Sequence, residues 1–507
     1  MRGAWIGFAV VMSTACRGED PLESERWLDP SAAVATVADS VHAFDVNAFD
    51  LAGPSGATYG KEPEIIVRSA EGALFVLAHD YGDDVRQPIG ATLLRLDRTA
   101  ETYIVTQVQR LANPVFLDRL VGFDRSPNGD LFIASAIDED DIVDANYPAN
   151  DQYRQGIVHV SQLSPEGEVV RQVDLDVART GGPATGRVQQ VINPMVAASG
   201  RLAYGDGHIA VTHGINTVPD PEIDNRRHQK KLTTVVDMTT GTVVRDSTTW
   251  VSHSFDHRLI FDGEAFVEMH LGDAFPRHVT VGRTPLGSDG RVQGYPVFGI
   301  KGGVGANVTR TRLGGLVALP DEGFSHLAVF VGERTVGTAD VGGVRNVAGS
   351  RDVGMTRFVR GFTAQEGPHL DPSLPDTMTA AEVTVSMRWL TDHDATEGRR
   401  HADRPHVVGL GADRYLVLWE EWDLGPTLSE ETFDGTFGMI IDSSGRSVVP
   451  VARLSEDRLP RGDDAVAVRM PGALRKAGAW VTADFESGAM TVHVVDSDLQ
   501  YETFEVP

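Results

Sequence analysis

The stretch "RLIFDGEAFVEMHLGD" (residues 258–273) decides the fold. Two apolar runs flank Asp262 and Gly263, a dipeptide typical of tight hairpin turns. The runs are short and nearly continuous, with little apolar/polar alternation, which indicates strands buried on both sides. The stretch therefore predicts an antiparallel hairpin inside a packed all-β protein.

The same pattern of strand, Gly/Asp/Asn turn and strand recurs along the chain. The other copies are "IIVRSAEGALFVLAHD" (65–80), "VGFDRSPNGDLFIASA" (121–136), "RLAYGDGHIAVTHG" (201–214), "LGGLVALPDEGFSHLAVFVGE" (313–333), "PHVVGLGADRYLVLWEEWD" (405–423) and the weaker "VRMPGALRKAGAWVTADFE" (468–486). Such recurrence is the signature of a repeat architecture.

A second, more amphipathic hairpin follows each copy, as in "KLTTVVDMTTGTVVRDS" (231–247). For the fifth unit we assign this role to "EVTVSMRWLTD" (382–392). The chain is therefore predicted to be all-β, a single β-propeller of seven four-stranded blades. A propeller of six blades is the alternative if the weak last unit is not a blade, and a pair of β-sandwiches is another. Long helical periodicity is missing, which disfavours α/β folds.

The N-terminus reads "MRGAWIGFAVVMSTAC": a basic residue, an apolar run, small residues and then Cys16, the only cysteine of the chain. It resembles the bacterial lipoprotein signal, and this resemblance implies lipidation of Cys16 after cleavage. An ordinary secretory signal cut at the same bond is the alternative. We expect residues 1–15 to be an export signal, 16–60 a lipid-attachment cysteine with a flexible tether, and 61–507 the β-propeller. The protein would be exported and held in the cell envelope, on an outer membrane or cell surface.

The chain carries 45 Lys and Arg against 72 Asp and Glu, a formal net charge of −27. That charge disfavours nucleic acid and anionic lipid surfaces as partners and suits divalent cations or basic partners. The one basic run comprises Arg226, Arg227, His228, Lys230 and Lys231. We interpret it as a solvated loop, and binding of an anionic ligand is the less favoured alternative.

Connection lengths predict which face of the ring is functional. The first-to-second and most third-to-fourth connections are short, and alternate connections of an antiparallel blade lie on opposite faces. The long connections therefore gather on one face; they are residues 80–90, 136–156, 176–198, 214–230, 333–355, 391–404 and 421–435. Binding usually occurs on elaborated loops held by a rigid scaffold.

Histidines and carboxylates at the ends of these strands form the candidate site. His253 and Asp256 precede the turn at Asp262, and His270 and Asp273 follow it at a similar separation, so all four should meet at the tunnel mouth on the long-loop face. His213 and His79 end other second strands and are further candidates. Such groups can hold a divalent metal or act as acid and base. The alternative is that they only satisfy loop amides.

A second candidate is a calcium site in "DEDDIVDAN" (138–146), with Asp138, Asp140, Asp141 and Asp144 as ligands. It lacks the glycine and the final glutamate of an EF-hand. A divalent cation, calcium or a transition metal, is accordingly the only cofactor that the sequence suggests.

The signature motifs of common hydrolases, zinc proteases, phosphate loops and dinucleotide sites are missing from the sequence. The leading hypothesis is an exported, lipid-anchored β-propeller that binds an extracytoplasmic protein, glycan or small ligand on its long-loop face. The alternative is a metal-dependent hydrolase or lyase with a His/carboxylate site at the tunnel mouth. A purely structural envelope protein is the third hypothesis.

Lipidation of Cys16 is directly testable. A labelled fatty acid supplied to the native host should enter the protein, and the Cys16→Ser variant should carry no label. Unlabelled mature protein released freely from the cells would contradict the prediction.

Overall fold

In the computed structural model the chain forms a ring of β-sheets. The structure describes residues 65–70, 72–80, 90–111, 119–136, 157–176, 179–181, 188–193, 201–217, 229–249, 254–272, 277–286, 294–300, 311–320, 323–334, 350–359, 362, 369–380, 383–393, 400–424, 431–460, 465–470, 475–484 and 489–506. No helix within these ranges is long and apolar enough to cross a membrane.

The strands form seven antiparallel sheets, each built from one contiguous stretch of chain. Blade 1 contains β1 (Ile66–Ala70), β2 (Ala73–Asp80), β3 (Gly90–Arg98) and β4 (Tyr103–Leu111). Blade 2 contains β5 (Arg119–Arg125), β6 (Leu131–Ala136), β7 (Ile157–Leu163) and β8 (Val169–Asp176). Blade 3 contains β11 (Arg201–Gly205), β12 (His208–Thr217), β13 (Gln229–Asp237) and β14 (Thr242–Thr249). Blade 4 contains β15 (Ser254–Phe261), β16 (Ala265–Gly272), β17 (Arg277–Pro285) and β18 (Tyr295–Ile300).

The remaining three blades complete the ring. Blade 5 contains β19 (Arg312–Ala318), β20 (His326–Glu333), β21 (Arg351–Phe358) and β23 (Val383–Trp389). Blade 6 contains β24 (Arg400–Gly409), β25 (Tyr415–Leu424), β26 (Glu431–Ile441) and β27 (Ser447–Ser455). Blade 7 contains β28 (Val466–Arg469), β29 (Lys476–Asp484), β30 (Ala489–Val495) and β31 (Tyr501–Val506). The protein is thus an all-β, seven-bladed β-propeller, and the six-blade and sandwich alternatives are excluded.

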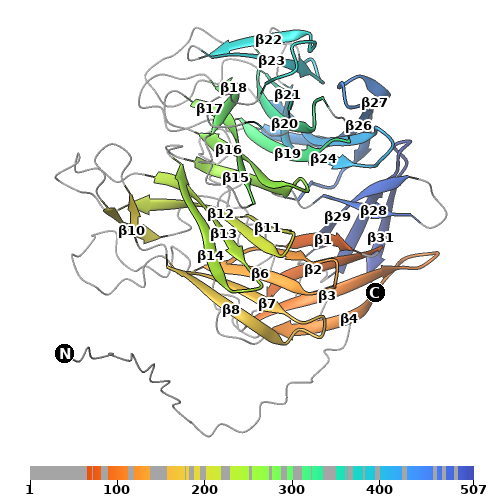
Figure 1. Cartoon of the computed structure of the whole chain (residues 1–507). Helices are drawn as coiled ribbons and strands as arrows, with labels where there is room; N and C mark the ends of the chain where they lie inside the picture. The colour runs from red at the N-terminus through yellow and green to blue at the C-terminus, as the bar shows by residue number, and fades with distance from the viewer. Residues whose placement is uncertain are drawn as a thin grey trace, which may run out of the picture.

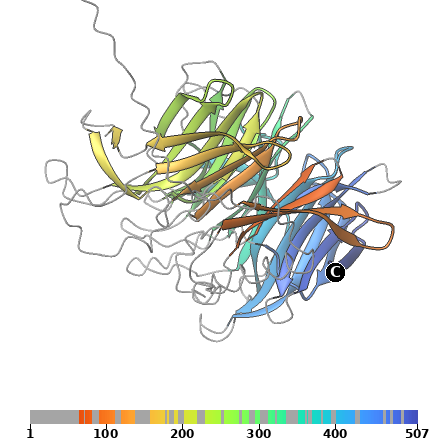
Figure 2. The same cartoon turned by 90° about the horizontal axis from the view of Figure 1, so that it is seen from below.

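The blades follow one another around the ring, so that the last blade lies beside the first (Figures 1 and 2). Apolar side chains fill the space between neighbouring blades, as when Leu74 and Val76 of blade 1 pack with Met490 and Val492 of blade 7. The second strands are the most deeply buried, and every residue of β16 is buried. This explains the continuous apolar runs in the sequence, because both sides of a blade face another blade.

Two parts of the predicted strand pattern are wrong. The third strand of blade 5 is β21, at the end of a segment predicted to be a loop (333–355), and its fourth strand, β23, pairs with the additional strand β22 (Asp376–Ala380). The connection predicted at 176–198 contains β9 (Arg179–Gly181) and β10 (Val188–Asn193), and β10 extends the blade 3 sheet by pairing with β12. The error in blade 5 arises because β21 carries three charged residues yet is fully buried.

The two faces of the ring differ as the connection lengths predict, with one exception in blade 5, where the long connection from Phe358 of β21 to Asp376 of β22 leaves the short-turn face. On the short-turn face, the first-to-second turns of blades 1 to 4 place Gly72, Gly129, Gly207 and Gly263 at φ between 76° and 94°, a conformation that favours glycine. On the opposite, long-loop face, second strands end and first strands begin.

First strands approach one another closely around the axis. A Cβ atom on Gly122 of β5 would lie 2.8 Å from the Leu202 backbone nitrogen of β11, and one on Gly314 of β19 would lie 2.9 Å from Pro405 of β24. Only glycine permits such contacts. The inner strands of neighbouring blades therefore support one another where the polar residues described below begin.

Candidate functional site

Buried ionisable residues of blades 3 to 6 gather toward the long-loop face. They are Arg201, His213, Lys231, His257, Arg258, Glu268, His270, His278, Arg351, Asp352, His401, His406, Glu420 and Glu421. A smaller set, Asp262, His326, Arg357 and Asp371, lies toward the short-turn face. Burying a charge is costly unless it is paired, so each member of the larger set needs a partner.

An ion pair joins blade 3 to blade 4. Lys231 of β13 donates its ammonium protons to Glu268 of β16, and both side chains are completely buried. The Thr233 hydroxyl donates to the second Glu268 oxygen over 2.5 Å and lies 3.0 Å from the Thr212 hydroxyl, from which it can accept. Burial lowers the pKa of Lys231, and Glu268 acts against this shift. This finding corrects the interpretation of residues 226–231, because Lys231 does not lie in a solvated loop.

Two buried histidines lie beside this pair. His257 of β15 and His270 of β16 are cross-strand partners, and their ring centroids are 6.5 Å apart. Burial, together with the nearby charges of Lys231 and His257, lowers the pKa of His270 well below its ordinary value. His270 is therefore neutral at pH 7, and neither ring nitrogen hydrogen bonds to any residue that the structure describes.

Charged residues also line the inner strands of blades 4 to 6. Asp256 accepts a 2.5 Å bond from Arg258, whose other terminal nitrogen donates to the Leu313 carbonyl of β19. Burial alone would raise the pKa of Asp256, but Arg258 and Arg201 hold it below its usual range. Arg258 thus binds Asp256 within blade 4 and links this blade to blade 5 through the Leu313 carbonyl.

The corresponding carboxylate of blade 6 is Asp403. It lies 3.5 Å from Arg312 and 3.6 Å from Arg351, both of blade 5. These arginines hold the pKa of Asp403 well below its usual range, although burial acts in the opposite direction. The adjacent Arg404 has φ 43°, which is strained for a non-glycine residue, and it contacts Glu420 at 3.5 Å. Burial raises the pKa of Glu420.

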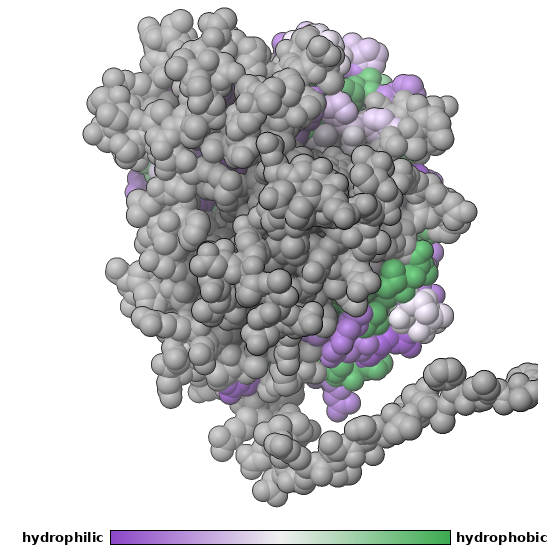
Figure 3. Space-filling view, turned by 90° about the vertical axis from the view of Figure 1, so that its left-hand side faces the viewer, coloured by the Kyte–Doolittle hydropathy of each residue, from purple (hydrophilic) through white to green (hydrophobic). Residues whose placement is uncertain are grey.

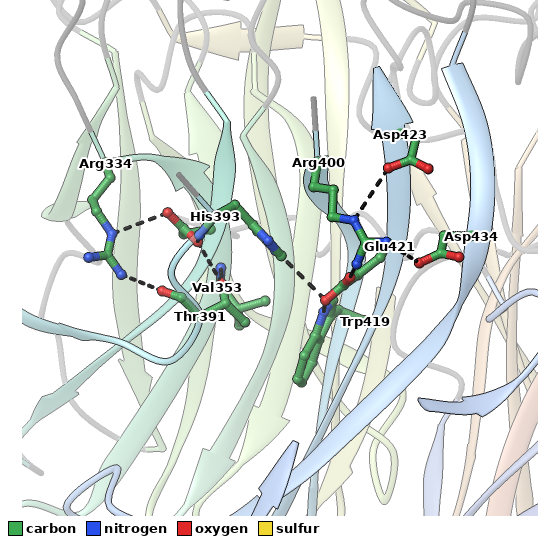
Figure 4. A network of polar contacts seen from close by, with 10 residues as sticks. Arg334, Val353, Thr391, His393, Arg400, Trp419, Glu421, Asp423 and Asp434 are labelled. Atoms are coloured by element: carbon green, nitrogen blue, oxygen red, sulfur yellow. Dashed lines mark hydrogen bonds and ion pairs between the residues drawn. The ribbon is translucent and has the colours of Figure 1, made fainter. Parts of the chain in front are cut away.

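A polar network crosses from blade 5 to blade 6 (Figure 4). Asp352 accepts bonds from the Thr391 hydroxyl (2.8 Å), the His393 backbone nitrogen (2.8 Å) and Arg334 Nε (3.1 Å). Burial raises the pKa of Asp352, while these donors favour its ionised form. Asp352 of β21 therefore holds Thr391 and His393, the first residues of the connection from blade 5 to blade 6, against its own strand.

Glu421 is the centre of the blade 6 half of this network. Its carboxylate accepts a 3.2 Å bond from the Trp419 indole and contacts Arg400 at 3.4 Å. Arg400 also lies 3.4 Å from Asp423 and 3.3 Å from Asp434. In Figure 4, Arg334 and Arg400 flank His393, whose ring points toward Glu421. Because the Arg400 side chain is 53% exposed, this network reaches the surface.

The structure places only some of the predicted site residues. His270 and Asp256 both lie near the long-loop ends of their strands, but Asp256 pairs with Arg258. His213 is buried next to Thr212 on β12 and, by strand alternation, projects to the opposite side of the sheet, toward blade 2. His79 lies near the end of β2 in blade 1. Cys16, His253, Asp273 and the calcium candidates Asp138, Asp140, Asp141 and Asp144 lie outside the described residues.

The metal prediction stays untested for those residues. Among the residues that the structure describes, no group of three or more His, Cys, Asp or Glu side chains could hold a metal ion.

Sequence reasoning missed several polar residues of this face, among them His257, Glu268 and Asp403, and it wrongly placed Lys231 in a solvated loop. Glu268 had a usable signal, because a lone glutamate within the apolar run "AFVEMHLG" must find a cation when both sides of its strand are buried. The identity of that cation depends on the register between two blades, which the sequence does not display.

No family model and no curated protein matches this chain. Solved structures similar to it include the β-propeller domain of the Trilobed protease from Pyrococcus furiosus (7% identity, TM-score 0.34, 88% of this chain and 96% of that one), described as having an open velcro topology. Others are an α-L-arabinanase from Penicillium chrysogenum (10%, 0.32, 76% and 93%) and a sialidase from Trypanosoma rangeli (10%, 0.37, 73% and 53%). These similarities concern architecture and carry no argument about activity.

The Lys231–Glu268 pair yields a stability prediction. Lys231→Met should lower the free energy of unfolding by about 3 to 5 kcal/mol, because it leaves a carboxylate buried without its counter-ion. The double variant Lys231→Met/Glu268→Leu should recover most of that loss. Urea denaturation followed by tryptophan fluorescence measures both. Equal losses in the single and double variants would contradict this account of the pair.

Proposed function

We propose that this protein is an exported, lipid-anchored β-propeller that binds a protein, glycan or small ligand on its long-loop face. The seven-bladed ring supplies a rigid support, and the connections from second to third strands and between blades emerge on that face. The anchor is the lipid expected on Cys16, and the body would extend from the envelope on the intervening tether.

The observation that carries the proposal is the concentration of ionic side chains at the ends of blades 3 to 6. A ring held together by apolar packing needs no buried Lys231, Glu268, Glu420 or Glu421. Replacing such groups by apolar residues is often neutral or stabilising, so their presence on one face favours a role beyond folding. The half-exposed Arg400 extends this set to the surface.

Binding can be tested by a charge reversal with a matched control. Arg400→Glu alters the long-loop face, whereas Arg446→Glu alters an exposed turn on the short-turn face. We expect immobilised protein to retain a component of the host's envelope fractions that, once identified and purified, binds again. Arg400→Glu should weaken this binding at least about tenfold. Equal binding by Arg400→Glu and Arg446→Glu would refute a site at the blade 5–blade 6 end of this face.

A metal-dependent hydrolase or lyase is the second candidate, and the pair His257 and His270 favours it. Both rings are buried on the same side of two paired strands, and His270 is neutral, with neither ring nitrogen hydrogen bonded to a described residue. Neutral imidazole is the form that binds transition metals.

Elemental analysis of purified protein before and after chelation tests this candidate. A stoichiometric transition metal that His270→Ala removes, with the thermal midpoint almost unchanged, would support it. If His270→Ala only lowers stability, by about 1 kcal/mol or more, the histidines are structural and the enzyme hypothesis falls.

A further inference from the structure

We propose that the outer edge of blade 2 is an interface at which β8 packs beside β8 of a second copy of this chain, with the two strands antiparallel. The inference goes beyond the proposed function and does not depend on it, because the edge lies on the rim of the ring and leaves the long-loop face free. It rests on four consecutive residues, Glu168, Val169, Val170 and Arg171, all of which the structure describes.

The edge exposes two valines. β8 is the outermost strand of blade 2, and none of the strands that the structure describes pairs with its outer edge (Figure 1). Val169 is 40% exposed and Val170 is 61% exposed. Val170 is the extra residue of a bulge, because Leu163 of β7 lies opposite Val169 and Gln162 lies opposite Arg171. The bulge therefore turns to the solvent an additional apolar side chain that contributes little to the packing of its own blade.

The charged residues on either side of the valines are unpaired in the described part of the chain. Neither the Glu168 carboxylate nor the Arg171 guanidinium forms an ion pair or a hydrogen bond with any residue of the described ranges. Three residues of an extended strand separate the two by about 10 Å, and their side chains do not meet. One copy of the chain thus leaves an acid and a base free on the same edge.

The order of these residues makes the edge complementary to itself. When a twofold axis passes between Val169 and Val170, antiparallel alignment places Glu168 opposite Arg171 of the second copy, and Arg171 opposite Glu168 of that copy. Each exposed valine then faces a valine. Both charges of the edge find an opposite charge, and the apolar side chains bury one another, as a closed isologous interface requires.

The neighbouring blade widens the apolar part of this edge. The turn of blade 3 lies against β8, since a Cβ atom on Gly241 would be 3.1 Å from Arg171 Nη1 and 3.7 Å from Val173 Cγ2. Val243 and Val244 follow this turn on β14 and are 47% and 51% exposed. Figure 3 shows hydrophobic patches beside hydrophilic ones on the described outer surface. Valine pairs on two adjacent outer strands form a larger apolar surface than single scattered residues do.

Other outer strands lack this self-complementarity. In β31 the residues on either side of Thr503 and Phe504 are Glu502 and Glu505, so the same alignment would place like charges opposite each other. β27 contains Pro450, which disfavours pairing along its edge. β14 has Thr242 where β8 has its glutamate, and no charge there meets a base. The sequence of β8 therefore distinguishes the edge of blade 2 from these three.

The net charge of −27 opposes association of two copies but acts mainly at long range. At about 0.15 M salt the Debye length is about 8 Å, so repulsion between distant charges is screened, whereas the Glu–Arg pairs are in contact. A bulge also disturbs the row of backbone groups on an edge strand, so specificity rests on side chains and not on a continuous ladder of backbone hydrogen bonds. We expect a weak dimer, with a dissociation constant on the order of 10 µM.

The test is sedimentation velocity of the mature chain at about 1 to 200 µM, a range that spans this constant. Every sample carries Cys16→Ser, so that neither a lipid nor a disulfide at this residue joins two copies. The parent should dimerise, and Glu168→Arg and Arg171→Glu should each weaken dimerisation at least about tenfold, because like charges then face each other. Glu505→Arg makes the same charge change at an exposed residue of β31 and should leave dimerisation unchanged.

Mixing the two single variants tests the alignment itself. The two positive charges of Glu168→Arg then face the two negative charges of Arg171→Glu, so a heterodimer should form although neither variant dimerises alone. The double variant Glu168→Arg/Arg171→Glu should dimerise like the parent. Failure of both the mixture and the double variant to dimerise would refute the antiparallel alignment.

The apolar contact is tested by Val170→Asp, with Val451→Asp at a 45% exposed valine of β27 as its control. Only Val170→Asp should weaken dimerisation, and because both side chains are exposed, both variants should keep the thermal midpoint of the parent. A parent that remains monomeric at about 200 µM, well above the expected constant, would overturn the interface. Dimers that Glu168→Arg and Val170→Asp leave intact would also overturn it, since the copies would then associate elsewhere.

Discussion

The ring depends on one contact, the packing of blade 7 against blade 1. Each blade is a contiguous stretch of chain, so none of the strands that the structure describes is shared across the closure. Seventeen buried residues form the apolar cluster there, more than at any other described blade interface, and polar side chains add further contacts between the two blades. Ser69 donates to the Ala467 carbonyl over 2.6 Å, and the Arg98 guanidinium lies 3.6 Å from the Phe504 ring centroid. Without this contact two blades would expose their apolar sides, and the strand ends of the long-loop face would not share a surface.

The interface between blades 3 and 4 is the opposite case. Its apolar cluster in the described residues has only five fully buried members, so polar side chains fill the rest of the space. Lys231, Glu268 and Thr233 take positions that apolar residues hold elsewhere in the ring. Such an interface is less stabilising than an apolar one, but it fixes the relative position of the two blades, because a buried ion pair tolerates fewer arrangements than an apolar contact. It therefore fixes the neighbouring His257 and His270 more tightly than a contact between aliphatic side chains would.

Much of the fold could be predicted from the sequence, because two short apolar runs on either side of a Gly turn form few structures other than a β-hairpin. The hairpin at Asp262 and Gly263 is confirmed, with His257 opposite His270. The third strand of blade 5 was missed because its charges find partners far away in sequence: Asp352 at Thr391 and His393, Arg351 at Asp403, and Arg357 at Asp371. A charged residue is interpreted from the sequence as exposed to solvent when its counter-ion is not known. Lys231 was interpreted as exposed for the same reason, because its partner Glu268 lies in another blade. The long-loop face could be predicted from connection lengths, but its ion pairs required the register between blades.

Bulges in the inner strands explain why the charges gather where they do. The first strands of blades 4, 5 and 6 each shift register near the long-loop face, between Ser254 and His257, between Leu313 and Gly315, and between Asp403 and His406. A bulge turns a side chain out of the regular alternation, and in blade 4 this residue is Asp256. In blade 6 the shifted segment holds Arg404 in a strained conformation that costs about 1 kcal/mol or more. Its contacts with Glu420 and the Leu459 carbonyl hold it there. The other described non-glycine residues with positive φ, Asp206, Ala412, Asp413 and Leu499, lie in turns between strands, whereas Arg404 lies within an inner strand. At this strand end the bulge and the ionic contacts together determine where the Arg404 side chain lies, and this is the argument for a functional surface there.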